Sequence, residues 1–270
     1  MDRRKILTSS VAASAWALAG SRLFGQSSAA AAAESGDREY YLLRCYKTIW
    51  GPEARTVHDF LREALIPAAN RLGVKPVGVF NVTIGDTMPR IYVLLPSTSL
   101  QTLANLDELM NQDSEFQKAG APLLNASAQH PAYLRRSSVL LRAMEGWPKL
   151  ALPEATAQKG ARMFELRTYQ DPTDQDHVRK LEMINSGYFP IFKEAGFSQV
   201  FYGDTLVGPT MPDLTYMLSF TDMTERDKCW KAFFATDAWK RLSTLPRYTF
   251  EQLVTKVSNE ILTPSDYSQI

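Results

Sequence analysis

The sequence MFELRTYQ stands at residues 163–170, and an imperfect copy of it, YYLLRCYK, stands at residues 40–47. A shift of 123 positions places Leu43 and Arg44 over Leu166 and Arg167. The same shift aligns three further blocks: Pro67, Gly73 and Val77 with Pro190, Gly196 and Val200; Gly85 with Gly208; and Thr87–Pro89 with Thr210–Pro212. A match that keeps its register over this length indicates two diverged copies of one structural unit.

Both copies show the same order of predicted elements. An alternating strand is followed by a helix that a glycine ends, then by two strands joined by a tight turn, a second helix and a closing strand. The ranges are, in the first copy, strands 39–47, 75–84, 90–95 and 136–143 with helices 52–73 and 99–117; and, in the second copy, strands 162–169, 197–206, 214–220 and 256–262 with a second helix at 223–242. The order βαββαβ predicts an α+β protein of two ferredoxin-like units, residues 38–145 and 161–264, with a linker at 146–160.

The first 33 residues have the features of an export signal peptide. A basic head with Arg3 and Arg4 precedes a short, alanine-rich apolar stretch and small residues that end near Ala33. Paired arginines before a weakly apolar stretch are typical of the twin-arginine export route. The apolar stretch is too short for a stable membrane anchor. We therefore expect cleavage near Ala33 and a periplasmic or secreted protein.

Composition is that of a globular protein large enough for two domains. Removal of residues 1–33 takes away four of the 30 Lys and Arg and one of the 29 Asp and Glu, so that 26 cations face 28 anions and the net charge is −2. This balance provides no excess of positive charge that would attract nucleic acid or an anionic membrane surface, so neither partner is expected.

The opening strand FELRTY and the aromatic second helix, with Trp230, Phe233 and Trp239, resemble the NIPSNAP family over nearly all of residues 38–264. The resemblance implies the dimeric α/β-barrel fold, in which two ferredoxin-like units join their sheets into one barrel, here within one chain. It also explains the repeat, because a second copy buries the sheet face that one copy leaves uncovered. Relatives in that group include cofactor-free oxygenases, isomerases and haem-handling proteins.

The second copy keeps the family pattern better than the first, in which Leu42 stands in place of Glu165 and Leu106 in place of Trp230. We therefore place a tentative ligand site in the second copy. Its residues are Glu165, Arg167, Tyr169 and Trp230, with Arg44 and Tyr46 as the equivalents in the first copy.

Strand alternation puts Glu165, Arg167 and Tyr169 on one face and Phe164, Leu166 and Thr168 on the other. We expect the polar face to be the one that the barrel covers. Buried there, the arginine must either pair with Glu165 in a purely architectural network or hold an anionic group of a ligand. Both alternatives stay open.

No metal or cofactor is expected from the sequence. His58, His130 and His177 are far apart, and none has a second ligand at metal-binding spacing. Cys45 and Cys229 show no redox or metal motif, and two isolated apolar side chains are the favoured interpretation, although an exported protein could pair them.

Two functions fit these observations. The first is the binding of a small organic ligand in a barrel pocket, with catalysis unproven, and it rests mainly on the fold. The second is a non-catalytic module for protein–protein interaction, because NIPSNAP proteins are linked to protein partnerships. A homo-oligomer is compatible with both.

Overall fold

The eight strands of the protein form one closed antiparallel barrel in the order β1-β3-β2-β8-β5-β7-β6-β4. The computed structural model describes residues 38–158, 160–249 and 253–270, which fold as one compact unit. The predicted export signal at residues 1–33 lies outside the described residues.

Each copy of the repeat folds as a βαββαβ unit. The first unit comprises β1 (Tyr40–Lys47), α1 (Pro52–Phe60), a π-helical turn (Leu61–Leu65), α2 (Ile66–Arg71), β2 (Gly78–Ile84), β3 (Arg90–Ser97), α3 (Leu100–Ala104), α4 (Leu106–Asn111), α5 (Ser114–Leu124) and β4 (Arg135–Ala143). After the short α6 (Glu154–Ala157), the second comprises β5 (Met163–Gln170), α7 (Asp174–Met183), a π-helical turn (Ile184–Tyr188), α8 (Phe189–Glu194), β6 (Ser198–Val207), β7 (Asp213–Phe220), α9 (Met223–Ala235), α10 (Asp237–Ser243), a 3₁₀ turn (Pro246–Tyr248) and β8 (Lys256–Pro264). The two π-helical turns are 123 residues apart, in the register of the sequence repeat.

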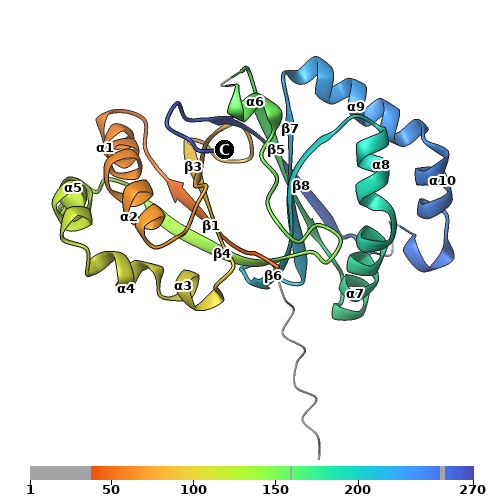
Figure 1. Ribbon diagram of the computed structural model, residues 1–270, viewed down its shortest axis with the longest axis horizontal. Helices are drawn as coiled ribbons and strands as arrows, with labels where there is room; N and C mark the ends of the chain where they lie inside the picture. Colours follow the sequence, from red (N-terminus) through yellow and green to blue (C-terminus); the bar gives the residue numbers. More distant parts are fainter. Residues whose placement is uncertain (1–37, 159, 250–252) are drawn as a thin grey trace, which may run out of the picture. The chain divides into compact units, whose positions relative to one another are not determined.

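The barrel closes where the two units meet. Within each unit the first strand lies between the third and the fourth, and β2 pairs with β8 while β4 pairs with β6. The predicted fold, two tandem ferredoxin-like units that form an intrachain α/β-barrel, is therefore confirmed. The helices α1–α5 flank the barrel on one side and α7–α10 on the other (Figure 1).

The expected second helix of each unit is divided into shorter helices at polar capping residues. The expected helix 99–117 is three helices that end at Leu124, and Asp113 caps the last of them by accepting hydrogen bonds from the backbone N–H groups of Glu115 and Phe116. Thr236 separates α9 from α10 in the same manner, by accepting a hydrogen bond from the N–H of Trp239.

Three apolar clusters hold the fold together. One lies between the first unit's sheet and its helices, and a second, rich in aromatic rings, lies between the second unit's sheet and its helices. The third fills one end of the barrel interior with Tyr41, Phe80, Phe164, Phe201 and the last residue, Ile270. That end of the barrel is thus closed by apolar side chains. No described helix is long and apolar enough to cross a membrane.

Candidate functional site

The four residues predicted as a site in the second unit do lie together. Arg167 on β5 donates to Glu165 Oε1 at 2.7 Å and to the Tyr169 hydroxyl at 3.2 Å. Trp230 on α9 donates its indole N–H to Glu165 Oε2 at 2.9 Å, and the Arg167 guanidinium carbon is 4.4 Å from the centre of the Trp230 indole. Strand alternation and the helix position therefore identified a real cluster.

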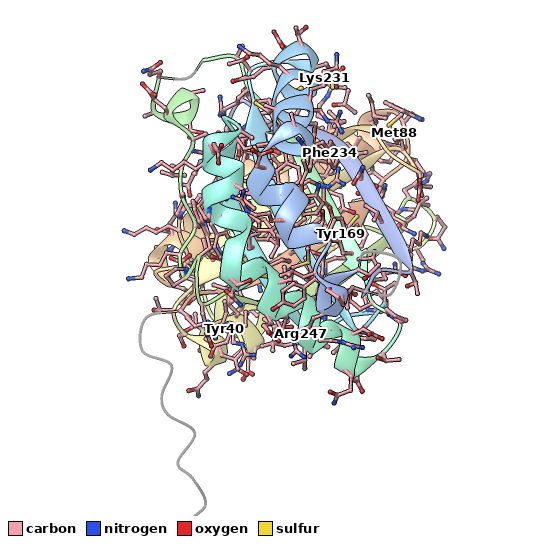
Figure 2. The ribbon with its side chains drawn as sticks, turned by 90° about the vertical axis from the view of Figure 1, so that its right-hand side faces the viewer. Tyr40, Met88, Tyr169, Lys231, Phe234 and Arg247 are labelled. Atoms are coloured by element: carbon pink, nitrogen blue, oxygen red, sulfur yellow. The ribbon has the colours of Figure 1, made fainter. Side chains whose placement is uncertain are left out.

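The face on which they lie is not the one expected. Glu165, Arg167 and Tyr169 point to the helices of the second unit, whereas Phe164 and Leu166 point into the barrel. Figure 2 looks onto this helical side, where Tyr169 belongs to the aromatic cluster beneath the helices and Phe234 is exposed on α9. The expectation failed because strands of this barrel are buried on both faces, so alternation separates the two faces without showing which one meets the helices.

Arg226 completes the cluster, and the sequence interpretation missed it. It donates from Nη2 to Glu165 Oε1 at 2.7 Å and from Nε to Oε2 at 3.0 Å. The signal was present, because Arg226 precedes Trp230 by four residues and therefore shares its helix face.

The carboxylate of Glu165 has no acceptor capacity left for a ligand. Each of its oxygens accepts two hydrogen bonds, and its side chain is fully buried. Burial alone raises the pKa of Glu165, but the bonds and charges of Arg226, Arg167 and Trp230 outweigh it and hold that pKa below its usual value. The geometry favours the architectural alternative for this cluster.

The equivalents in the first unit do not form the same cluster. Arg44 is buried and pairs with Asp107 of α4 at 2.7 Å, while its Nε and Nη1 atoms have no hydrogen-bond partner among the described residues. Tyr46 is buried against the edge of Tyr133 at a ring-centre distance of 5.3 Å. Leu42 provides no carboxylate, so Asp107 takes its place from a helix.

His177 forms a second ion-paired group that sequence reasoning treated as an ordinary helix residue. Its Nδ1 lies 2.6 Å from Asp171 Oδ2 and its Nε2 lies 2.9 Å from Asp204 Oδ1. Burial lowers the pKa of His177, but the two carboxylates outweigh it and raise that pKa to about 9. The imidazolium therefore joins the end of β5 to β6 through α7.

The end of the barrel opposite the apolar cluster is hollow and polar. A cavity of ≈ 300 Å³ there is lined by residues from both units, and we call it the barrel mouth. Its lining includes Leu43, Cys45, Lys47, Asp86, Arg90, Tyr92, Ser137, Val139, Leu166, Thr168, Gln170, Pro209, Thr210, Asp213, Thr215, Lys256, Ser258 and Glu260. Cys45 thus faces a polar cavity and is a free thiol, as is Cys229 on α9.

One wall of the barrel mouth carries a closed triad. Arg90 donates to Glu260 and, at 3.0 Å, to the Tyr92 hydroxyl, which in turn donates to Glu260 Oε2 at 2.7 Å. Burial and the neighbouring carboxylate raise the pKa of Tyr92, and burial also raises the pKa of the Cys45 thiol. Both groups are therefore neutral hydrogen-bonding partners at neutral pH.

The opposite wall comes from the second unit and has different chemistry. Thr168 and Thr215 share a hydrogen bond of 2.8 Å, and Asp213 accepts from Thr205 and, at 2.7 Å, from Thr210. The 123-residue shift relates Cys45 to Thr168, Lys47 to Gln170, Arg90 to Asp213, and Tyr92 to Thr215. The two walls are thus equivalent in position and different in side chain at every one of these places.

No local motif pointed to the barrel mouth, because its lining comes from six strands and two turns. The available signal was the repeat itself, in which Cys45 and Thr168, Lys47 and Gln170, and Arg90 and Asp213 are aligned but differ in polarity or charge. Among the described residues no group of three or more His, Cys, Asp or Glu is arranged to hold a metal ion.

The second unit matches a known protein family. Residues 164–269 match the sequence model of the NIPSNAP family. This match covers the opening strand and the aromatic helix on which the resemblance was based, and the first unit lies outside it. No curated protein matches the chain.

Solved structures show the same fold at low identity. A monooxygenase-like protein from Fusobacterium nucleatum subsp. nucleatum is 10% identical, with a TM-score of 0.56, over 85% of this chain and 93% of that one. A second monooxygenase-like protein, from Lactobacillus acidophilus NCFM, is 8% identical, with a TM-score of 0.54, over 84% and 94% of the two chains. An anthrone oxidase-like protein is 11% identical, with a TM-score of 0.51, over 85% and 92%. At these identities the likeness shows the dimeric α/β-barrel fold alone.

Proposed function

We propose that the protein binds a small organic molecule in the barrel mouth. One observation carries the proposal: the barrel interior, filled by apolar side chains at one end, holds a cavity of ≈ 300 Å³ at the other, lined by both units. Binding sites for small molecules are concave, largely preformed and lined by apolar groups with a few placed polar ones. Mouths of barrels are a common place for them.

The lining indicates an amphiphilic ligand. Leu43, Val139 and Leu166 give apolar contact, while hydroxyl groups of both walls offer hydrogen bonds. Lys47 and Lys256 are exposed at the strand ends, and neither is in an ion pair among the described residues. A ligand with an apolar body and an anionic group directed to these lysines fits this distribution.

The test is to fill the cavity without changing the rest of the fold. A Val139→Phe variant adds an aromatic ring inside the barrel mouth and should abolish uptake of medium-chain carboxylates and hydroxylated aromatic acids, measured by native mass spectrometry. Ser138→Phe is the matched control, because Ser138 is the exposed neighbour on the same strand. Equal uptake by Val139→Phe and the wild type would overturn the proposal.

The alternative function, a non-catalytic module for protein interaction, is favoured by a separate feature. An apolar groove of ≈ 370 Å³ lies between α8 and α10, lined by Pro190, Ile191, Ala238, Leu242 and Leu245 among others. An amphipathic helix of a partner protein is the occupant that fits such a groove. Leu242→Glu should then abolish partner capture while leaving ligand uptake unchanged.

Export and family membership of the first unit complete the proposal. The arginine pair and the alanine-rich stretch of residues 1–33 support twin-arginine export and a periplasmic location. The 123-residue register supports a first unit that is a diverged NIPSNAP copy. Intact-mass measurement of the protein from a periplasmic extract should show a chain that begins close to Glu34, and a full-length precursor there would contradict export.

A further inference from the structure

Six exposed large apolar side chains lie in the loops at the barrel-mouth end. They are Trp50 in the β1–α1 connection, Ile84 at the end of β2, Met88 in the β2–β3 turn, Leu134 before β4, Val207 at the end of β6 and Met211 in the β6–β7 turn, with exposed fractions of 76%, 56%, 45%, 49%, 61% and 49%. Apolar side chains that gather at one place on a surface usually mark an interaction site. We call these six residues the mouth rim.

Backbone hydrogen bonds hold the three loops of the first unit next to one another. The N–H of Thr48, two residues before Trp50, donates to the carbonyl of Pro89 at 3.2 Å, and the N–H of Leu134 donates to the carbonyl of Lys47 at 2.8 Å. The β2–β3 turn and the β6–β7 turn also line the cavity, through Asp86 and Pro209 respectively. The mouth rim therefore borders the opening of the barrel.

Part of the rim is duplicated with the repeat. A shift of 123 residues relates Ile84 to Val207 and Met88 to Met211, so each unit presents two apolar side chains from the same turn. The two walls inside the barrel mouth differ in every polar position described above, yet these two turn positions are apolar and exposed in both units. The other two rim residues belong to the first unit alone, since Trp50 corresponds to Thr173 and Leu134 to the half-buried Val257.

The strand ends at the barrel mouth carry exposed cations. Lys47, Arg135 and Lys256 are exposed there, against the exposed carboxylates of Asp86 in the β2–β3 turn and Asp174 at the start of α7. Arg90 binds Glu260 inside the barrel mouth, and Asp213 accepts hydrogen bonds from two threonines there, so neither charge belongs to the exposed rim. A whole-chain charge near zero therefore conceals a local excess of cations around an apolar rim.

We infer that the mouth rim docks reversibly on an anionic lipid surface. Tryptophan prefers the boundary between the headgroups and the acyl chains, and short apolar side chains from turns insert to a shallow depth beside it. Exposed lysines and arginines near such a rim gain attraction from anionic headgroups. The docked barrel would open toward the membrane, so that an amphiphile could pass between bilayer and barrel mouth without crossing water.

The docking surface is tested with vesicles and no added ligand. The protein should co-sediment with phosphatidylcholine vesicles that contain phosphatidylglycerol, and binding should fall with added salt and be lost on phosphatidylcholine alone. A Trp50→Ser, Met211→Ser double variant should weaken the partition at least about tenfold, since burial of one large apolar side chain corresponds to about that factor. Arg135→Glu should weaken it about fivefold or more.

Matched variants at the other end of the molecule control for general effects. Leu152→Ser with Met223→Ser removes two similarly exposed apolar side chains, and Lys75→Glu reverses a charge in the loop before β2. All variants carry the same residues 1–37, so their differences report on the surface alone. These controls should sediment like the wild type, and an equal loss in both sets would overturn the inference.

Two further outcomes would also overturn it. If the rim variants instead convert an oligomer into a monomer in sedimentation velocity runs without vesicles, the rim is an interface between copies of the chain. If vesicle binding is absent while a protein partner is captured only by the wild-type rim, the surface binds protein. The Val139→Phe variant separates this inference from the ligand proposal, because it should lose ligand and keep vesicle binding.

Discussion

The two units bury the same arginine of their first strand in different ways. In the second unit Arg167 shares Glu165 with Arg226 and Trp230, so a fully buried carboxylate has every acceptor position filled. In the first unit Arg44 has one carboxylate, Asp107 of α4, which is 45% exposed and also binds Arg136 at 2.8 Å. The fold thus requires a counter-charge for this arginine but does not prescribe the element that provides it.

The largest effect is expected when the units are separated. Residues 38–145 and 160–270 expressed apart would each expose the apolar barrel face and two unpaired strand edges. Both fragments should aggregate or self-associate in size-exclusion chromatography. Two well-behaved monomers would show that the units are independent domains.

The next largest loss of stability is expected when Glu165 is replaced by leucine, the residue at the equivalent position of the first unit. Glu165→Leu leaves Arg167 and Arg226 largely buried without their shared carboxylate, so the free energy of unfolding should fall by about 3 to 5 kcal/mol. Urea unfolding followed by tryptophan fluorescence measures it. Glu115→Leu, which removes an exposed partner of Arg71, is the control and should change stability little, because Arg71 keeps Asp113.

A smaller effect distinguishes the two arginines. Arg167→Met takes one donor from Glu165 and should cost about 1 to 3 kcal/mol, whereas Arg44→Met should stay within about 1 kcal/mol of the wild type. The reason is that Asp107 remains solvated and paired after the change, while two unsatisfied N–H groups of Arg44 disappear. The same variants test the tentative ligand site. An Arg167→Met protein that melts like the wild type but takes up no ligand would assign Arg167 to ligand binding.

The smallest effect is a pH dependence that belongs to the second unit. The first unit has Thr48, Ala54 and Asn81 where the second has Asp171, His177 and Asp204. The pKa of His177 is raised to about 9, above its unfolded value of about 6.5, so its stabilisation is complete below pH 6.5 and is lost as the pH rises through 9. Between pH 6.5 and 8 the loss should be about 1 to 2 kcal/mol.

The measurement is urea unfolding across that window, with His177→Gln as the comparison. Burial lowers the pKa of Lys180 to about 8, so the titration of Lys180 opposes that of His177 as the pH approaches 8 and more strongly above it. The window therefore ends at pH 8. His177→Gln should lose the slope between pH 6.5 and 8. A slope that persists in the variant would assign it to other groups.

The polar cluster around Glu165 could be predicted from the sequence, whereas none of the six residues predicted as a ligand site lines the barrel mouth. Alternation along β5 and helical spacing along α9 group Glu165, Arg167, Tyr169 and Trp230, because each pattern depends on neighbours within a few residues. Neither pattern states which face meets the helices, since both faces of a barrel strand are buried. The expected face was therefore wrong although the cluster was right.

The sequence by itself determined the duplication and the order of elements in each unit, and the resemblance to the NIPSNAP family implied the barrel. The duplication and the element order follow from local periodicity and from a repeat register of 123 residues. Only the tertiary structure decided where the polar groups meet. Arg90, Tyr92 and Glu260 come from two strands of opposite units, 168 residues apart between Tyr92 and Glu260. The barrel mouth and its rim exist only after ring closure brings the strand ends together, and no pattern of short range records that closure.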